Sequence, residues 1–336
     1  MRIAVDAMGG DFAPRAVVEG AYLYQKETNV SNELVLIGDR TEIVENLNRY
    51  KDWQDKNIVI IHSEQKIEMN ESPTEALKKK KNSSMLVGIN LHKQKEVDAF
   101  VSAGNTGAQM AASLLSLGRI EGVTRPAIGS FIPCEKGVVF LIDVGANIDC
   151  KSINLYQFGV MAKIFFEQTF TNTKVSIGLL NIGQEEKKGN EVSQVAYQLM
   201  KNSLKGFTGN IEGRDLLKGV VDIIVCDGFV GNIILKFAES VTGVLSKSLK
   251  RNLGSNLFIN LGALLVKPAF SEIRKSYDYQ EYGGVPLLGV NGISIICHGH
   301  SSGKAIKNAI HVATQMSLKR VNKHIADSFK DKEGEN

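Results

Sequence analysis

Short apolar runs rich in β-branched residues alternate along the chain with longer stretches whose apolar positions recur at helical spacing. The short runs predicted as strands are Arg2–Asp6, Glu33–Gly38, Asn57–His62, Val97–Ser102, Val138–Val144, Lys174–Leu180, Val221–Asp227 and Gly292–Cys297. Two of these runs contain the stretches Val138–Ile142 and Ile223–Cys226, which are apolar at every position and so indicate sheets covered on both faces. The pattern therefore predicts an α/β fold with a largely parallel, doubly wound sheet.

Amphipathic helices fill most of the intervals between these strands, and no repeat period or low-complexity linker interrupts the alternation. A length of 336 residues suits two domains or one large α/β unit. We expect a single large α/β unit over residues 1–329 and a frayed, charged tail over residues 330–336.

The charges nearly balance, with 40 Lys+Arg against 36 Asp+Glu and a net charge of +4. This composition is that of a globular protein, and it excludes a disordered acidic chain and a nucleic-acid binder that depends on one dominant charge. None of the four cysteines forms a Cys-x-x-Cys pair, and the chain enters a strand directly at Met1–Asp6, without an export signal. The uncharged stretch Asn252–Val266 is shorter than the roughly 20 apolar residues that cross a bilayer. A cytoplasmic location is therefore expected.

Glycine is abundant, with 32 residues against 6 prolines, and the glycines gather in polar turns after the strands. These turns are Asp6–Asp11, Ser102–Gly107, Asp143–Asn147, Leu180–Gly183, Asp227–Asn232 and His298–Gly303. In open α/β sheets ligands bind outside the carboxyl ends of the strands, where helix N-termini present free N–H groups. The turns thus predict one polar site assembled from many strand ends.

Two of these turns suit an anion. Asn105 and Thr106 open a helix that runs to Gly118, and the neighbouring glycines let the backbone approach a ligand. Asn232 and Lys236 lie on one face of a predicted helix over Val230–Leu249, a placement that suits an oxyanion or a phosphate. The alternative for each pair is ordinary helix capping, with Lys236 on the surface.

The helix over Val230–Leu249 also has an apolar face, which we expect to be buried. It is formed by Ile233, Ile234, Phe237, Val241, Val244 and Leu245.

The carboxylates Asp6 and Asp11 flank Gly9 and Gly10. A pair of carboxylates at a strand end can orient a catalytic base, and the alternative is a capped turn.

The sequence does not fully match the motifs of dinucleotide-binding proteins, P-loop NTPases or serine hydrolases. No strand is followed by Gly-x-Gly-x-x-Gly, and Gly299–Ala305 is one residue too short for a P-loop and has Ala305 where Ser or Thr should hold Mg²⁺. Gly299–Gly303 does match the Gly-x-Ser-x-Gly elbow of a serine hydrolase, with Ser301 as the nucleophile. No Asp or Glu follows Ser301 before Asp327, so the triad order is wrong.

His298 and His300 lie beside Cys297, but the sequence offers no third ligand. We therefore predict neither a metal site nor a cofactor.

In chain order these segments closely resemble the PlsX family, the phosphate acyltransferases of bacterial phospholipid synthesis. The matching segments are Asp6–Asp11 with Pro14, Ser83–Met85, Ser102–Ala108, Asp143–Asn147, Leu180–Gly183, Cys226–Phe229 with Gly231 and Asn232, and Leu288–Gly289 with His298–Gly299. More distantly, the segment Gly231–Lys236 and the final strand, turn and helix resemble phosphotransacetylases. That resemblance implies a two-part architecture with the site between the parts.

The resemblance implies an activity and partners. The expected reaction joins acyl-[acyl-carrier-protein] and inorganic phosphate to give acyl phosphate and free carrier protein, and the product would pass to the membrane acyltransferase PlsY. The family also implies a homodimer that contacts an anionic membrane peripherally. Where relatives carry small apolar residues this chain has His300 and Ser301, so His298 is the stronger candidate of the two histidines.

Phosphate can attack the thioester directly, so the site must hold the anion, stabilise an oxyanion and protonate a thiolate. We assign phosphate to the turn Gly104–Gly107 with Asn147, Asn181 and Lys236. The oxyanion or the leaving sulfur falls to His298 with Asn232, and Asp227 would orient a donor. The candidate catalytic residues are thus Asp227, Asn232, Lys236 and His298, and the candidate phosphate- or substrate-binding residues are Asp6, Gly9, Gly10, Asp11, Ser102, Gly104, Asn105, Thr106, Gly107, Asp143, Asn147, Asn181 and Ser301.

A helical insertion over residues 250–282 combines an apolar stripe at Leu253–Val266 with basic flanks. Such a segment suits a membrane surface, and a dimer or core helix or a carrier-protein contact remains open. A serine hydrolase using Ser301 and a non-catalytic scaffold for acyl carrier protein are the alternative functions.

Overall fold

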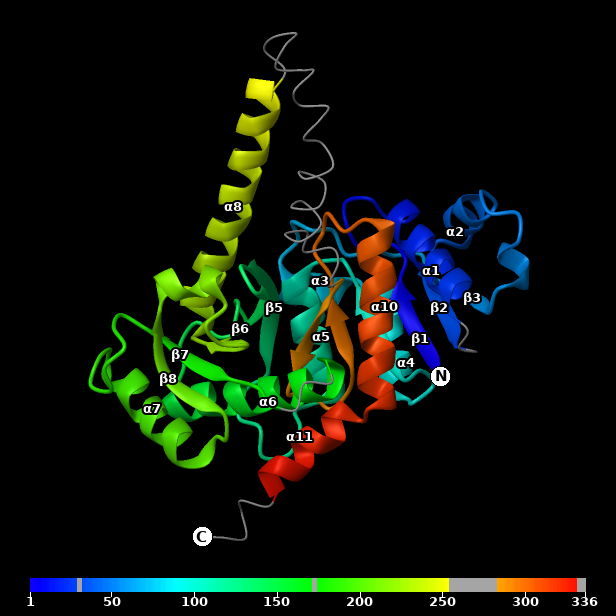
Figure 1. Cartoon of the computed structure of the whole chain (residues 1–336). Helices are drawn as coiled ribbons and strands as arrows, with labels where there is room; N and C mark the ends of the chain where they lie inside the picture. Colours follow the sequence, from blue (N-terminus) through cyan, green and yellow to red (C-terminus); the bar gives the residue numbers. More distant parts are fainter. Residues whose placement is uncertain (29–31, 171–173, 254–282, 331–336) are drawn as a thin grey trace. The chain divides into compact units, whose positions relative to one another are not determined.

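The computed structural model describes residues 1–28, 32–170, 174–253 and 283–330, which form two compact units (Figure 1). Unit 1 comprises Met1–Gly129, Val160–Val175 and Gln280–Asn336, and unit 2 comprises Ser130–Gly159 and Ser176–Tyr279. The predicted tail beyond residue 330 and the insertion beyond residue 253 lie outside the described residues. The expected site between two parts therefore stays a prediction.

Unit 1 contains a mostly parallel sheet in the order β3-β2-β1-β4-β11-β10-β5. Its strands are β1 (Arg2–Asp6), β2 (Glu33–Gly38), β3 (Ile58–His62), β4 (Ala99–Ser102), β5 (Ala127–Cys134, which continues into unit 2), β10 (Val285–Leu288) and β11 (Ser294–Ile296). β10 runs antiparallel to both of its neighbours, β11 and β5, and the other pairs described in this sheet are parallel. Strands β1, β4 and β11 are adjacent and parallel, so the turns that follow them meet at one edge of the sheet.

Unit 1 also contains several helices. They are α1 (Arg15–Glu27), α2 (Arg40–Leu47), the 3₁₀ turn η1 (Trp53–Asp55), α3 (Pro73–Lys79), α4 (Ser84–Lys93), α5 (Thr106–Leu117), α10 (Gly303–Leu318) and α11 (Val321–Lys330). Helices α4 and α5 pack with one another and against the sheet. Helix α10 packs against α1 and also against the sheet. Ala4 packs in the cluster formed with α4 and α5, whereas Ile3 and Val5 are buried and face the other way because strand side chains alternate. Both faces of the unit 1 sheet are therefore covered.

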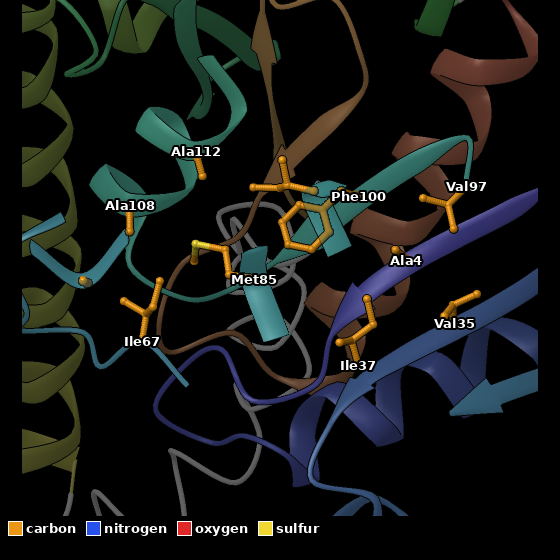
Figure 2. Packing of buried hydrophobic residues seen from close by; sticks show 11 residues of the cluster. Ala4, Val35, Ile37, Ile67, Met85, Val97, Phe100, Ala108 and Ala112 are labelled. Atoms are coloured by element: carbon orange, nitrogen blue, oxygen red, sulfur yellow. The ribbon is translucent and has the colours of Figure 1, made fainter. Parts of the chain in front are cut away.

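Figure 2 shows the buried cluster between the sheet and helices α4 and α5. Phe100 of β4 lies beside Met85 of α4, and Gly88 gives the Phe100 ring its space, because a Cβ there would lie 2.4 to 2.6 Å from ring carbons. This packing fixes β4 and therefore the turn that follows Ser102.

Unit 2 has its own parallel sheet, in the order β6-β9-β7-β8. Its strands are β6 (Gly137–Ile142), β7 (Ile177–Asn181), β8 (Phe207–Glu212) and β9 (Ile223–Val225). Its helices are the first part of α6 (Ser152–Phe170), α7 (Glu191–Ser203), the 3₁₀ helix η2 (Gly213–Lys218) and α8 (Gly228–Leu253).

The predicted strands are confirmed to within a few residues at each end. Strands β5, β8 and β10 were not predicted. Gly129 and Pro133 interrupt β5, Gly209 and Asn210 interrupt β8, and β10 is only four residues long, so each lacks a continuous apolar run.

The predicted helix after Asp227 is confirmed, but its apolar face is not buried. Ile234 is only partly buried, and Leu245 lies outside the side chains that the structure describes. We call the exposed residues Phe229, Val230, Ile233, Phe237, Val241 and Val244 the α8 apolar stripe. Periodicity identifies an apolar face, whereas what covers it is set by tertiary packing. Among the described helices, none is both long and apolar enough to cross a membrane.

His92, near the end of α4, is held in its neutral form. Its Nδ1 lies 3.0 Å from the Val97 carbonyl oxygen, and its Nε2 accepts a hydrogen bond from the Ile293 N–H at 2.8 Å. Burial lowers the pKa of this imidazole below its ordinary value of 6.5. The folded state therefore binds this proton less readily than the unfolded state does.

We expect the free energy of unfolding to fall as the pH drops below about 6.5 towards the lowered pKa of His92, because only the unfolded state then gains a proton. Urea denaturation between pH 7.5 and pH 5 measures this slope. In His92→Gln, whose amide can keep one donor and one acceptor, the slope should be shallower, and equal slopes in parent and variant would exclude His92 as its source.

Candidate functional site

In unit 1 the turns after β1, β4 and β11 touch one another. A Cβ on Gly10 would lie 3.1 Å from both the Ala103 Cβ and the Gly299 carbonyl oxygen, and Gly10 has a φ of +105°. Only glycine fits both the conformation and the space. Of the predicted residues, the structure thus brings together those at Asp6–Asp11, Ser102–Gly107 and His298–Ser301.

Asp6 lies at the centre of this edge with 2% of its surface exposed. Its Oδ2 accepts a hydrogen bond from the Ser102 Oγ at 2.7 Å, and the Ser102 Oγ accepts one from the Gly104 N–H at 3.0 Å. The Met8 N–H also donates to the Asp6 carboxylate, at 3.2 Å.

Burial raises the pKa of Asp6, while hydrogen bonds from Ser84, Ser102 and backbone N–H groups oppose the shift. A buried carboxyl that costs folding free energy and ties two turns together is a candidate for positioning the site, not for touching substrate.

Both ends of the Asn105 side-chain amide form hydrogen bonds within the protein. Its Oδ1 caps α5 by accepting from the Ala108 N–H at 3.0 Å. Its Nδ2 donates to the carbonyl oxygens of Glu68, Met69 and Glu71 at 3.4, 3.1 and 3.0 Å.

Gly107 packs against Pro73, 2.8 Å from where its Cβ would lie, so it serves packing as well as close approach to a ligand. Within the described ranges no acceptor meets the N–H groups of Thr106 or Gly107. An anion at this turn would therefore bind to those backbone groups, helped by the positive end of α5, and not to the Asn105 side chain.

The turn after β11 carries the two exposed histidines. The His298 Nδ1 accepts the His300 N–H at 3.2 Å, which in the neutral ring assigns the proton of His298 to Nε2. The His300 Nδ1 lies 2.9 Å from the Asp11 Oδ2, and the Asp11 N–H donates to the Gly299 carbonyl oxygen at 2.8 Å. The Asp11–His300 pair was not predicted, since a hydrogen bond between turns from opposite ends of the chain leaves no local signal.

Ser301 does not have the surroundings of a hydrolase nucleophile. It is 3% exposed, and its Oγ has no hydrogen-bond partner in the described part of the chain, whereas a nucleophilic serine needs a bonded base. Burial raises the pKa of the Cys297 thiol to about 12. Cys297 therefore does not supply a thiolate nucleophile at this turn.

In unit 2 the Asp143 carboxylate holds the turn that follows β6. It accepts hydrogen bonds from the Ala146 N–H at 3.1 Å, the Asn147 N–H at 2.7 Å and the Asn147 Nδ2 at 2.8 Å. The start of α8 packs directly on this turn, because a Cβ on Gly231 would collide with the Asp143 carbonyl oxygen. The close approach explains both glycines at the start of α8, since a Cβ on Gly228 would lie 2.6 Å from the Asn147 carbonyl oxygen.

The remaining predicted residues of unit 2 have local partners. Asp227 accepts the Val230 N–H at 2.9 Å and so caps α8, and Asn232 lies against Gly145. Lys236 pairs with Glu239 at 2.9 Å on the surface. The Asn181 Nδ2 donates to the Lys188 carbonyl oxygen within its own loop. Asp143, Asn147, Asp227 and Asn232 are thus brought together, and the predicted phosphate contact of Lys236 stays a prediction.

A cavity of about 360 Å³ in unit 1 opens beside Asp11. The segment Lys66–Asn70, together with Met8 and Glu42, lines it. No local pattern predicted a role for this segment, which follows β3 and is held by the Asn105 side chain. In the described residues no group of three His, Cys, Asp or Glu side chains could hold a metal ion.

Comparisons with known proteins cover nearly the whole chain. The profile of a family described as fatty acid synthesis protein matches residues 1–324. The phosphate acyltransferase of Dictyoglomus turgidum is 49% identical over 331 residues, 98% of this chain and 98% of that protein. The phosphate acyltransferase of Pelotomaculum thermopropionicum is 47% identical over 329 residues, 98% of this chain and 95% of that protein.

Two solved structures have a similar fold. A phosphotransacetylase from Streptococcus pyogenes has a TM-score of 0.63 at 16% identity, covering 95% of this chain and 94% of that one. A branched-chain phosphotransacylase from Enterococcus faecalis has a TM-score of 0.57 at 13% identity, covering 94% and 99%. These likenesses confirm the predicted fold class and, at this identity, speak to the fold alone.

Proposed function

This chain belongs to the fatty acid synthesis protein family and is an acyltransferase, and we propose that it transfers an acyl group from acyl carrier protein to inorganic phosphate. The observation that carries the proposal is identity of nearly one half with phosphate acyltransferases along almost the entire chain. The polar edge of unit 1 supports it with the groups that such a transfer needs.

The chemistry needs no covalent enzyme intermediate. A phosphate oxygen attacks the thioester carbonyl, a tetrahedral oxyanion forms, and the carbon–sulfur bond then breaks. We assign phosphate to the backbone N–H groups of Thr106 and Gly107 at the N-terminus of α5, and the oxyanion to the Nε2–H of His298. Asp6 positions the first of these groups through Ser102.

One assay separates the candidate functions. The protein is incubated with acyl-[acyl-carrier-protein], with and without phosphate, and acyl phosphate is trapped with hydroxylamine. Acyl phosphate that appears only with phosphate supports the transferase. Fatty acid released without phosphate would instead indicate a hydrolase, and no turnover in either case a scaffold.

We further propose that a second copy of this chain covers the α8 apolar stripe, giving a homodimer whose membrane contact and handover to PlsY involve the segment that follows α8. The stripe supports a dimer because Phe237 is 69% exposed and Val244 65% exposed on one continuous helix face. Permanent homodimer interfaces are the more apolar class of protein contacts.

Phe237→Glu is therefore expected to weaken self-association by at least about 10-fold, since burying an unpaired carboxylate is costly. Sedimentation velocity of parent and variant measures this, and Leu115→Glu, which alters an exposed leucine of α5, is the control. A monomeric parent, or a Phe237→Glu variant that remains dimeric, would contradict the proposal. Loss of liposome binding with the dimer intact would mark the stripe as a membrane face instead.

A further inference from the structure

The two histidines after β11 have opposite hydrogen-bonding arrangements. The His298 Nδ1 accepts the His300 backbone N–H at 3.2 Å, which leaves Nε2 as the ring nitrogen that can act as a donor when the ring is neutral. The His300 Nδ1 instead faces the Asp11 carboxylate at 2.9 Å, a contact that orients the ring and leaves its Nε2 directed away from Asp11. These are the surroundings of an oxyanion donor and of a proton-transfer group, respectively.

The proposed transfer has a step that needs the second kind of group. An alkyl thiolate whose thiol has a pKa of about 8.5 leaves more readily when a proton reaches the sulfur as the carbon–sulfur bond breaks. Neither Cys297 nor Ser301 can serve, because both side chains are buried. The ring of His300 is 66% exposed, so a substrate can reach it.

We propose that His300, oriented by Asp11, protonates the thiolate that leaves during acyl transfer, an inference that rests on the proposed function. The phosphate oxygen forms the new bond to the acyl carbon, and the electron pair of the carbon–sulfur bond passes to sulfur. Sulfur takes the proton from the His300 Nε2. The attacking hydrogen phosphate ion gives up its own proton, which restores the imidazolium, so no further reactant is needed.

The cavity beside Asp11 supports this placement. It has a volume of about 360 Å³, and Met8 and Met69 share its lining with acidic and amide side chains. Lys66 pairs with Glu68 at 3.2 Å, so the lining offers acceptors and thioether surface and little net positive charge. This lining suits an uncharged, pantetheine-like chain that carries amide groups and ends in sulfur. It disfavours binding of a free phosphate ion.

The test compares two acyl donors with thiols of different basicity. S-acyl-pantetheine releases an alkyl thiolate that needs a proton, whereas an acyl 4-nitrothiophenyl ester releases a weakly basic thiolate that does not. His300→Ala is expected to lower kcat for phosphate-dependent acyl phosphate formation at least about 10-fold with the first donor, and less than about twofold with the second. Asp11→Asn should show the same pattern, more weakly, as a positioning residue.

His311→Ala, which removes an exposed histidine from α10, is the matched control and should leave both rates unchanged. Equal losses with the two donors would show that His300 only maintains the turn, and unchanged rates would show that it has no role. Either result would overturn the inference while the proposed function stands. If the parent forms acyl phosphate from neither donor nor from acyl-[acyl-carrier-protein], the proposed function falls, and the role of His300 with it.

Discussion

Replacing Asp6 with asparagine is expected to lower phosphate-dependent turnover by about 10²-fold and to leave the protein at least as stable at pH 7. The amide cannot accept from both Ser102 and Met8 as the carboxylate does, so the Gly104 N–H and the turn at the start of α5 lose their fixed position. If the backbone N–H groups of Thr106 and Gly107 are displaced, the rate of turnover should fall, even though Asp6 is too deeply buried to touch substrate.

The stability half of this expectation follows from the raised pKa of Asp6. The folded state holds this proton more tightly than the unfolded state, so the free energy of unfolding of the parent falls as the pH rises from 3.8 through the raised pKa. Above that range the parent carries the full cost of a buried charge, and Asp6→Asn does not. The gain in stability of the variant should therefore shrink as the pH is lowered towards 3.8.

Thermal unfolding of both proteins between pH 4 and pH 7.5, with turnover measured at pH 7, tests both halves. Ser102→Ala is the matched change, since it removes the link between the carboxylate and Gly104 without touching the charge. A stable Asp6→Asn protein with parental turnover would remove Asp6 from the site. A variant that unfolds at pH 7 would show that the carboxylate is there for stability.

Replacing His298 with alanine is expected to lower kcat by about 10²-fold, the usual cost of removing one oxyanion donor. The loss should be equal for S-acyl-pantetheine and for the 4-nitrothiophenyl ester, because the tetrahedral oxyanion forms with either donor. His298→Gln, which keeps an N–H donor on a side chain of similar reach, should recover part of the rate.

The measurement is the same trapped-product assay, with His324→Ala, an exposed histidine of α11, as the control. A fall in kcat only with S-acyl-pantetheine would assign thiolate protonation to His298 and leave the oxyanion contact to His300. Turnover near the parental rate would mean that another group stabilises the oxyanion.

The antiparallel strand β10 illustrates what local pattern misses. Its four residues, Val285–Leu288, carry a proline and are too short to show a strand period, yet they pair with both β11 and β5. The pairing depends on partners far away in the chain. The parallel strands were predictable because burial on both faces requires a run of apolar residues that can be read without knowing the partner.

The site shows the same division. The turns at Asp6–Asp11, Ser102–Gly107 and His298–Gly303 could be found because glycine and polar residues after a strand have a local cause. The partner of each side chain could not. The Asn105 amide donates to carbonyl oxygens of the segment after β3, Lys236 pairs with Glu239, and His300 contacts Asp11. Each of these contacts depends on how the chain is packed.

By itself the sequence determined the α/β class, the order of most strands along the chain, the polar turns and the family, because alternation, glycine placement and motif order are properties of the chain. Only the tertiary structure decided that Asp6 is buried, that the Ser301 Oγ has no hydrogen-bond partner among the described residues and that the α8 apolar stripe is exposed. The reason is physical: burial, pKa and hydrogen-bond partners depend on which distant segments fold against a residue, and no local pattern records them.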